Sequence, residues 1–288
     1  MMNGPIAKTT KAIAASLNEE IIPRLRARHG VHAPSERSEG NERRASVQQV
    51  CATSKRSTAD GSFEPVEIEA FARALMAAGD GNWRDAFADQ VDRVRDRPTL
   101  RDGLLAPAAA RLGEWWTTDD ASMVDVTVAT ARLQAALEAL PGAPRDGAGS
   151  RMLLMPAPGD THVFGLFMLA DALREADWSV RVELRPDPVR INRIMASDRF
   201  DVIGIGIAAT RFGPAAIDLL NALRSGARER SQAVFMAGGP GAEPNRTALL
   251  AAGFSAVVAP GTRIADRVNA ALAASSPNGT SVPSLVRA

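Results

Sequence analysis

The stretch from Arg151 to Gly165, RMLLMPAPGDTHVFG, decides the fold of this chain. Its first half is an apolar run typical of a buried strand, and its second half opens a helix. In such a strand-to-helix turn we expect His162 to point outward, Asp160 to hold one of its ring nitrogens, and Gly165 to leave space by lacking a Cβ. The turn therefore predicts the approach of a bulky ligand.

Strand-like runs alternate with helical patterns over the second half of the chain. The runs lie at 152–157, 178–184, 201–207, 233–237 and 256–259. This alternation predicts a doubly wound α/β fold with five parallel strands. We expect the flavodoxin-like type, in which the strand order is 2-1-3-4-5. The ligand crevice of such a sheet lies at the carboxyl ends of the first and third strands. His162 follows the first of these strands, and Gly206 is at the end of the third.

Four helical patterns precede the sheet region, at 66–78, 83–95, 100–116 and 120–140. Short turns between them, Arg97-Pro98 among others, predict a four-helix bundle of antiparallel neighbours. We expect an N-terminal helix near 6–28. The predicted regions are a helix and disordered linker at 1–64, a bundle and linker at 65–148, a sheet domain at 149–275 and a disordered tail at 276–288.

Composition narrows the class of protein. Lys and Arg number 34 and Asp and Glu 33, so the chain lacks the basic excess of proteins that mainly bind nucleic acid. A single cysteine, Cys51, excludes an internal disulfide and a multi-thiolate zinc site. No run approaches the ~18 apolar residues of a membrane helix, and no secretory signal is evident. These features predict a cytoplasmic protein that does not bind a membrane.

The motif Asp160-x-His162-x-x-Gly165, followed by Gly238-Gly239 after the fourth strand and preceded by a bundle, resembles a known family. It is the cobalamin-binding fold shared by methionine synthase, corrinoid methyltransferase proteins and cobalamin photoreceptors. The resemblance implies that His162 replaces the dimethylbenzimidazole base as lower cobalt ligand and that Asp160 orients its ring. Without the resemblance, Asp160 is an ordinary helix cap and Gly238-Gly239 a tight turn.

The chain departs from the family on the third strand. The family has Ser-x-Leu there, and this sequence has Gly206 and Ala208 at the two positions. Without the serine hydroxyl, we expect the chain of hydrogen bonds behind the cobalt ligand to end at Asp160. The displaced nucleotide tail is implied to pass four glycines: Gly165, Gly206, Gly238 and Gly239.

A second pattern lies in the last helices of the predicted bundle. Trp116 is followed ten and eleven residues later by Val126-Thr127, where photoreceptors linked to MerR regulators have Glu-His. With the following Arg132-Leu-Gln, the pattern is similar to the AerR/PpaA group, which are antirepressors of photosynthesis genes in purple bacteria. The resemblance covers about residues 65–275.

Adjacent residues on a helix point about 100° apart, so Trp115 and Trp116 cannot both face the same way. We expect Trp116 to face the corrin while Trp115 packs in the bundle. The residues expected beside Trp116 are Met123, Val124 and Thr127. Core packing of both tryptophans is the alternative, because a small bundle buries large aromatic rings in any case.

The resemblance implies a cobalamin-dependent light sensor, not an enzyme, that holds cobalt in adenosyl-, methyl- or hydroxocobalamin. Its implied partner is a transcription repressor of the CrtJ/PpsR type, and DNA is reached only through that partner. The alternatives are a corrinoid carrier of a methyltransferase system, a haem-binding sensor, and a fold without a ligand. His29 and His32 are a hypothesis for an upper cobalt ligand after illumination, and solvated linker histidines are the alternative.

Overall fold

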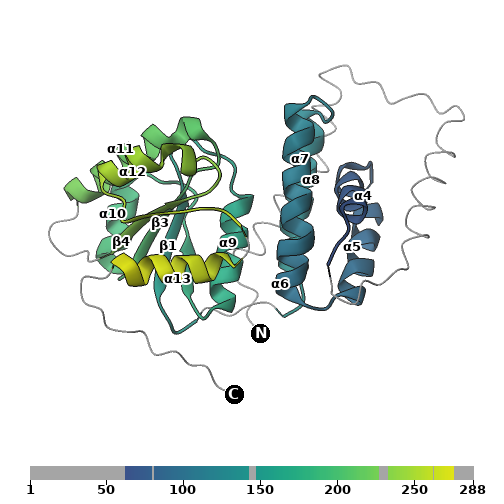
Figure 1. Ribbon diagram of the computed structural model, residues 1–288, viewed down its shortest axis with the longest axis horizontal. Helices are drawn as coiled ribbons and strands as arrows, with labels where there is room; N and C mark the ends of the chain where they lie inside the picture. The colour runs from purple at the N-terminus through teal and green to yellow at the C-terminus, as the bar shows by residue number, and fades with distance from the viewer. Residues whose placement is uncertain (1–61, 80, 143–146, 227–232, 262, 276–288) are drawn as a thin grey trace, which may run out of the picture. The chain divides into compact units, whose positions relative to one another are not determined.

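The computed structural model describes residues 62–79, 81–142, 147–226, 233–261 and 263–275 (Figure 1). Its contacts divide the chain into two compact units, Met1–Pro141 and Gly142–Ala288, and each is treated separately below. The helix predicted at 6–28, nearly all of the linker predicted up to residue 64, and the tail at 276–288 lie outside the described residues. His29, His32 and Cys51 lie outside them as well.

The first unit contains the helical segments predicted from the sequence. Their bounds are Pro65–Met76 (α4), Gly81–Arg93 (α5), Arg97–Leu100 (α6), Ala106–Thr117 (α7) and Met123–Ala139 (α8). A π-helical turn, Arg101–Leu105, joins α6 to α7 into one continuous helix. Pro107 lies just after this turn and has no N–H for a regular α-helical bond, which favours the irregular turn before it. Helix α4 contacts α5, α7 and α8.

The third predicted helix begins earlier than expected, because Arg97-Pro98 is a first helical turn and not a loop. Asp96 is the N-cap, and its carboxylate accepts the hydroxyl of Thr99 and, at 2.9 Å, the N–H of Thr99. These bonds, the hydroxyl bond foremost, lower the pKa of Asp96. Proline is well tolerated in a first helical turn, where its missing N–H has no partner to lose.

Two buried arginines close the ends of the bundle helices. Arg132 on α8 donates to the carbonyls of Leu75 and Ala77, each at 2.8 Å, and to that of Gly79 at 3.2 Å. These carbonyls lie in the last turn of α4 and just after it, where helix geometry leaves carbonyls without intrahelical partners. The side chain of Arg97 does the same for α8, through the carbonyls of Leu137, Leu140 and Pro141. Each guanidinium therefore fixes one helix end against another helix.

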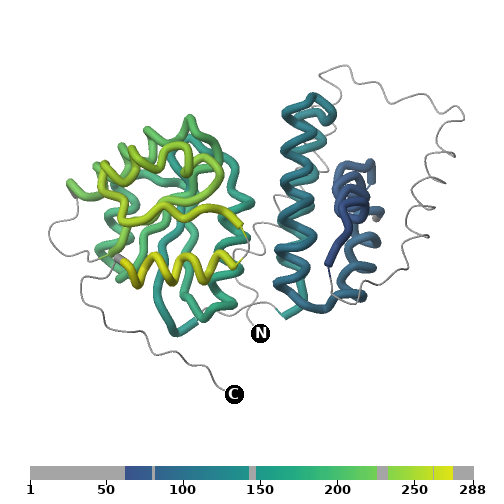
Figure 2. Tube along the Cα trace, in the orientation of Figure 1, coloured from purple at the N-terminus to yellow at the C-terminus, as the bar shows by residue number. Residues whose placement is uncertain are grey.

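The second unit is a five-stranded parallel sheet in the order β2-β1-β3-β4-β5, which confirms the predicted topology. Figure 2 traces the chain of this unit in colours that run from teal to yellow. The strands are Arg151–Pro156 (β1), Ser179–Val182 (β2), Val202–Gly206 (β3), Val234–Gly238 (β4) and Ala256–Val258 (β5). The helices are Phe164–Glu175 (α9), Pro188–Ser197 (α10), Gly213–Gly226 (α11), Arg246–Ala252 (α12) and Ile264–Ser275 (α13).

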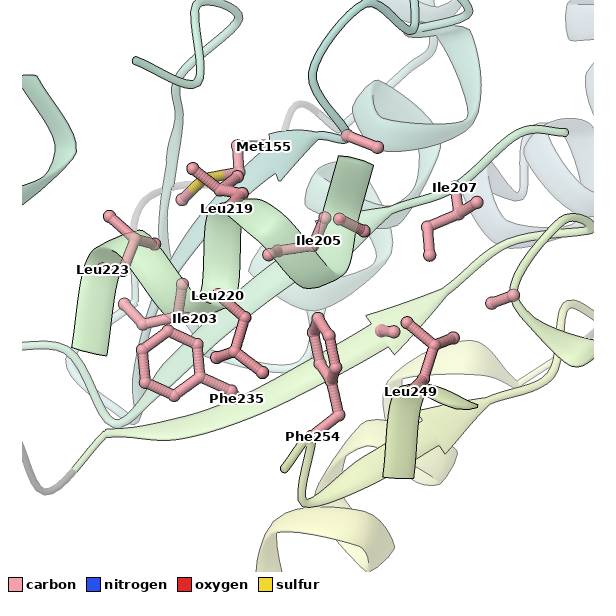
Figure 3. Packing of buried hydrophobic residues seen from close by; sticks show 14 of the residues in the cluster. Met155, Ile203, Ile205, Ile207, Leu219, Leu220, Leu223, Phe235, Leu249 and Phe254 are labelled. Carbon is pink, nitrogen blue, oxygen red and sulfur yellow. The ribbon is translucent and has the colours of Figure 1, made fainter. Parts of the chain in front are cut away.

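Helices cover both faces of the sheet. One core joins alternate sheet residues such as Ile203 and Ile205 to α10, α11 and α12, and includes Leu219 and Leu249 (Figure 3). The other core joins the opposite side chains, such as Met152, to α9 and α13. Burial on both faces explains why the strands are continuous apolar runs in the sequence.

The carboxyl ends of the three central strands lie level with one another. Pro156 of β1 pairs with Gly206 of β3, and Gly206 pairs with Gly238 of β4. In a doubly wound sheet the chain turns in opposite directions from β1 and β3, so their following loops part and leave a crevice at this edge. The register therefore sets where a ligand can meet the sheet.

Replacing Arg132 tests how far the bundle depends on the buried guanidinium. Arg132→Met keeps most of the apolar stem but leaves three carbonyls without their donor, which is expected to destabilise the fold by about 2–3 kcal/mol. Urea unfolding followed by circular dichroism measures the loss. Arg95→Met, at an exposed position, is the matched control and should change stability by less than about 0.5 kcal/mol. Equal stabilities of the two variants would contradict the role given to Arg132.

Candidate functional site

The turn between β1 and α9 carries the predicted ligand residues. After β1, the N–H of Ala157 bonds the carbonyl of Gly206 at 2.8 Å, and the N–H of Asp160 bonds the carbonyl of Ala157 at 3.0 Å. Gly159 between them has φ +82°, a conformation that favours glycine. Helix α9 then begins at Phe164. The chain therefore leaves the sheet in a tight turn that ends close to the edge of β3.

Within this turn Asp160 holds the ring of His162. The Nδ1 atom of His162 lies 2.9 Å from Oδ1 of Asp160, and the same oxygen accepts the N–H of His162 at 3.0 Å. The carboxylate is buried, with 1% of its side chain exposed, whereas 63% of the imidazole is exposed. A carboxylate acceptor favours the tautomer with the proton on Nδ1, which leaves the lone pair of Nε2 for a metal.

The helix that follows does not use Asp160 as its cap. The N-cap of α9 is Val163, which makes no side-chain capping bond. The ordinary capping role that the sequence also allowed is therefore wrong. Asp160 acts on the imidazole and on the backbone of its own turn.

The expectation that the hydrogen bonds end at Asp160 is also wrong. The second carboxylate oxygen, Oδ2, accepts the backbone N–H of Ala208 at 2.8 Å. A main-chain amide in the loop after β3 thus takes the place that the resemblance assigned to a serine hydroxyl. Because the donor is a backbone N–H, which every residue except proline has, the residue type at position 208 does not predict this hydrogen bond. The two loops that flank the crevice are joined through one carboxylate.

The glycines predicted to line a nucleotide tail differ in their surroundings. A Cβ at Gly165 would meet no atom within 4 Å, so the space beside the first turn of α9 is open. A Cβ at Gly206 would lie 2.4 Å from Cδ2 of Leu166, so the side chain of Leu166 fills the space that the missing Cβ leaves. A nucleotide tail at Gly206 therefore requires Leu166 to move.

The remaining two glycines form the turn after β4. Gly239 has φ +102°, and a Cβ there would lie 2.5 Å from the carbonyl oxygen of Ile207. A Cβ at Gly238 would lie 3.3 Å from the carbonyl oxygen of Val258. Backbone conformation and close packing thus require glycine at position 239 whether or not a ligand binds. Contact of Gly238 and Gly239 with a ligand stays a prediction.

In the first unit, the two neighbouring tryptophans face different surroundings. Trp115 is 5% exposed, and its ring lies under the guanidinium groups of Arg73 and Arg111, at 5.0 and 5.1 Å from the ring centroid. Trp116 is 46% exposed and Met123 is 70% exposed. The different orientations agree with the 100° separation expected on a helix. Two large apolar side chains are therefore presented to solvent at the turn between α7 and α8.

The other two residues predicted for this surface lie on the first turns of α8. Val124 is half-buried, and Thr127 is exposed. The hydroxyl of Thr127 donates to the carbonyl of Met123 at 2.7 Å, so it is satisfied within its own helix. Contact of this surface with a corrin stays a prediction.

Sequence reasoning missed two contributors to the crevice: the N–H of Ala208 and the side chain of Leu166. Leu166 is 5% exposed and belongs to the core that α9 forms with the sheet. Its apolar periodicity in α9 predicts burial, but it does not tell which strand residue the side chain covers. For Ala208 the sequence holds no signal.

Comparison with known proteins identifies the second unit. Residues 150–269 match the family model "B12 binding domain". These residues form a B12-binding domain. One imidazole, held at Nδ1 and exposed, fits a cobalt ion whose equatorial ligands come from the corrin ring. The resemblance drawn from the Asp-x-His-x-x-Gly motif is therefore confirmed.

The chain is also similar to a curated protein. It is the "uncharacterized 20.5 kDa protein in bchF-crtJ intergenic region" of Rhodobacter capsulatus, which is 34% identical over 110 residues. The match covers 36% of this chain and 57% of the relative, so the chain spans little more than half of that protein. The likeness is consistent with the resemblance to the AerR/PpaA group.

Solved structures agree on the fold. The monomethylamine corrinoid protein of Methanosarcina barkeri has a TM-score of 0.57 with 13% sequence identity, over 70% of this chain and 95% of that chain. At that identity the likeness shows the fold and nothing finer. No helix among the described residues combines the length and the apolar character needed to cross a membrane.

The fit between Gly206 and Leu166 is open to a direct test. Gly206→Ser introduces the family's residue and a clash with Leu166, which is expected to destabilise the domain by about 1–3 kcal/mol. Leu166→Ala alone opens a cavity and is expected to cost about 2–4 kcal/mol. In the double variant each change relieves the other, so the combined loss is expected to be smaller than the sum.

Urea unfolding of the four proteins, followed by tryptophan fluorescence and circular dichroism, gives the coupling between the two positions. Leu173→Ala, a buried change on the same helix, serves as control and should add to Gly206→Ser without coupling. Simple additivity of Gly206→Ser and Leu166→Ala would contradict the packing described.

Proposed function

We propose that this chain is a cobalamin-binding, light-responsive regulator that acts as antirepressor of a transcription repressor of the CrtJ/PpsR type. One observation carries the proposal: in a B12-binding domain, an exposed His162 is held at Nδ1 by the buried carboxylate of Asp160. The regulatory part is supported by the relative named for the bchF-crtJ region and by the helical pattern that resembles the AerR/PpaA group.

The chain's own groups divide the work of holding the cofactor. His162 is proposed to bind cobalt through Nε2 in place of the dimethylbenzimidazole base. The carboxylate of Asp160 fixes the ring orientation and makes Nε2 a stronger donor. The amide of Ala208 holds that carboxylate in place from the opposite loop. Gly165 leaves open space beside the ligand.

The bundle is proposed to bind the upper side of the corrin. Its exposed Trp116 and Met123 offer apolar side chains for this contact at the turn between α7 and α8. An alkylcobalamin supplies a cobalt–carbon bond that visible light breaks. Trp116 and Met123 would lie against that light-sensitive bond, and the protein would respond to light if it bound the cofactor unequally in two arrangements.

We further propose a cytoplasmic protein without catalytic activity, whose effect on DNA passes through the repressor. A corrinoid carrier would bind the same cofactor, but it would turn over a methyl group on the cobalt when a methyltransferase is present. Methyl transfer assays therefore separate the carrier from the regulator. The absorption spectrum separates cobalamin from haem.

Replacing His162 tests the cobalt ligand. With hydroxocobalamin, His162→Ala is expected to weaken binding about 10- to 100-fold and to shift the visible absorption bands, because the nitrogen below the cobalt is lost. Equilibrium dialysis and absorption spectra measure both effects on the full chain. Thr161→Ala, an exposed neighbour in the same turn, is the control and should bind like the parent. Retention of the cofactor by His162→Ala with unaltered colour would contradict the assignment.

The light response is tested on the holoprotein with adenosylcobalamin. Its affinity for the purified repressor is expected to differ between darkness and green light by about 5- to 150-fold, the usual range of coupling between two sites. Fluorescence anisotropy with labelled repressor measures the affinity. The protein without cofactor is the control and should show one affinity in both conditions. Identical affinities of the holoprotein in darkness and light would reject the regulatory role.

A further inference from the structure

The loop after β3 runs beside the turn that holds His162. It contains a short 3-10 turn, Thr210–Phe212, that leads into α11. At its start the N–H of Ala208 bonds Asp160 at 2.8 Å. At its end the ring of Phe212 lies 3.8 Å from the place that a Cβ of Gly159 would take. The loop is therefore bonded to the His162 turn at its start and lies close to that turn at its end.

A further contact fixes the middle of this loop. The side-chain amide of Asn245 donates to the carbonyl of Thr210 and to that of Gly241, each at 2.9 Å. Phe212 also packs against the core formed by α10, α11 and α12. The backbone at Arg211 thus has a defined position at the carboxyl edge of the sheet.

The side chain of Arg211 presents a cation at this edge. It is exposed, and its guanidinium carbon lies over the ring of Phe212, 4.5 Å from the centroid. No carboxylate among the residues that the structure describes forms an ion pair with it. By contrast, Arg190 pairs with Glu183 at 2.8 Å, and Arg246 pairs with Glu243 at 2.8 Å. The charge of Arg211 is therefore held in place by stacking and left available for a ligand.

The chemistry of the cofactor shows what such a cation would meet. The side chains of the corrin ring are neutral amides, whereas the nucleotide tail contains a phosphodiester with one negative charge. The tail leaves the corrin on its lower side, which is the side that His162 is proposed to bind. A guanidinium recognises phosphate oxygens with two parallel N–H bonds.

We propose that Arg211 binds the phosphodiester of the nucleotide tail and so selects cobalamin over corrinoids that lack the tail. The inference rests on the proposed cobalamin binding and adds a residue that determines its specificity. Stacking on Phe212 reduces the freedom that the arginine loses when it binds, which strengthens the contact.

The test compares two ligands on the full chain. Hydroxocobalamin carries the phosphodiester, and cobinamide has the same corrin without phosphate and nucleotide. Arg211→Gln is expected to weaken binding of hydroxocobalamin about tenfold and to leave binding of cobinamide unchanged. Arg211→Lys, which keeps the charge but not the planar fork, is expected to lie between. Absorption titrations and equilibrium dialysis give both constants.

Arg193→Gln, at an exposed position of α10, is the matched control and should bind both corrinoids like the parent. The preference of the parent for hydroxocobalamin is expected to fall with added salt, and that of Arg211→Gln is not. Equal losses for both ligands, or no loss for either, would overturn the role of Arg211 while cobalamin binding stands. Failure of the parent chain to bind either corrinoid would instead overturn the proposed function and this inference with it.

Discussion

The crevice depends on one buried carboxylate. Asp160 accepts three N–H groups: the main chain of His162, the ring of His162, and the main chain of Ala208. A buried carboxylate without such donors would strongly destabilise the fold. The fold must therefore place the carboxylate of Asp160 and the three N–H groups together. The same bonds orient an exposed imidazole and join the two loops that border the crevice. Loss of the carboxylate would affect the ligand and the loops at once.

The parallel sheet provides the frame for this arrangement. The level register of Pro156, Gly206 and Gly238 brings the loops after β1, β3 and β4 to one edge. Helices bury both faces of the sheet, so ligand chemistry is left to the loops. The side chain of Leu166 covers Gly206, so the protein itself fills part of the crevice. A group as large as a nucleotide tail would reach Gly206 only if the side chain of Leu166 moved.

In the bundle, buried arginines hold the ends of the helices. Its helix ends are held by the buried guanidinium groups of Arg97 and Arg132, which supply donors to terminal carbonyls. One tryptophan of the adjacent pair, Trp115, is buried with two guanidinium groups over its ring, and the other, Trp116, is exposed, as is Met123. The bundle therefore leaves two large apolar side chains exposed at the turn between α7 and α8.

The sequence by itself determined that strands alternate with helices in the second unit, because apolar periodicity and alternation reflect local geometry and burial. The strand order was assumed from the flavodoxin-like type of fold, and the sheet confirms it. It also placed Asp160 two residues before His162, a spacing within one turn. Only the tertiary structure decided the bond from Asp160 to Ala208, 48 residues away, the cover of Leu166 over Gly206, and the position of Phe212 near the Gly159 turn. These depend on main-chain donors and on packing between segments that the sheet brings together, and neither leaves a pattern in residue types.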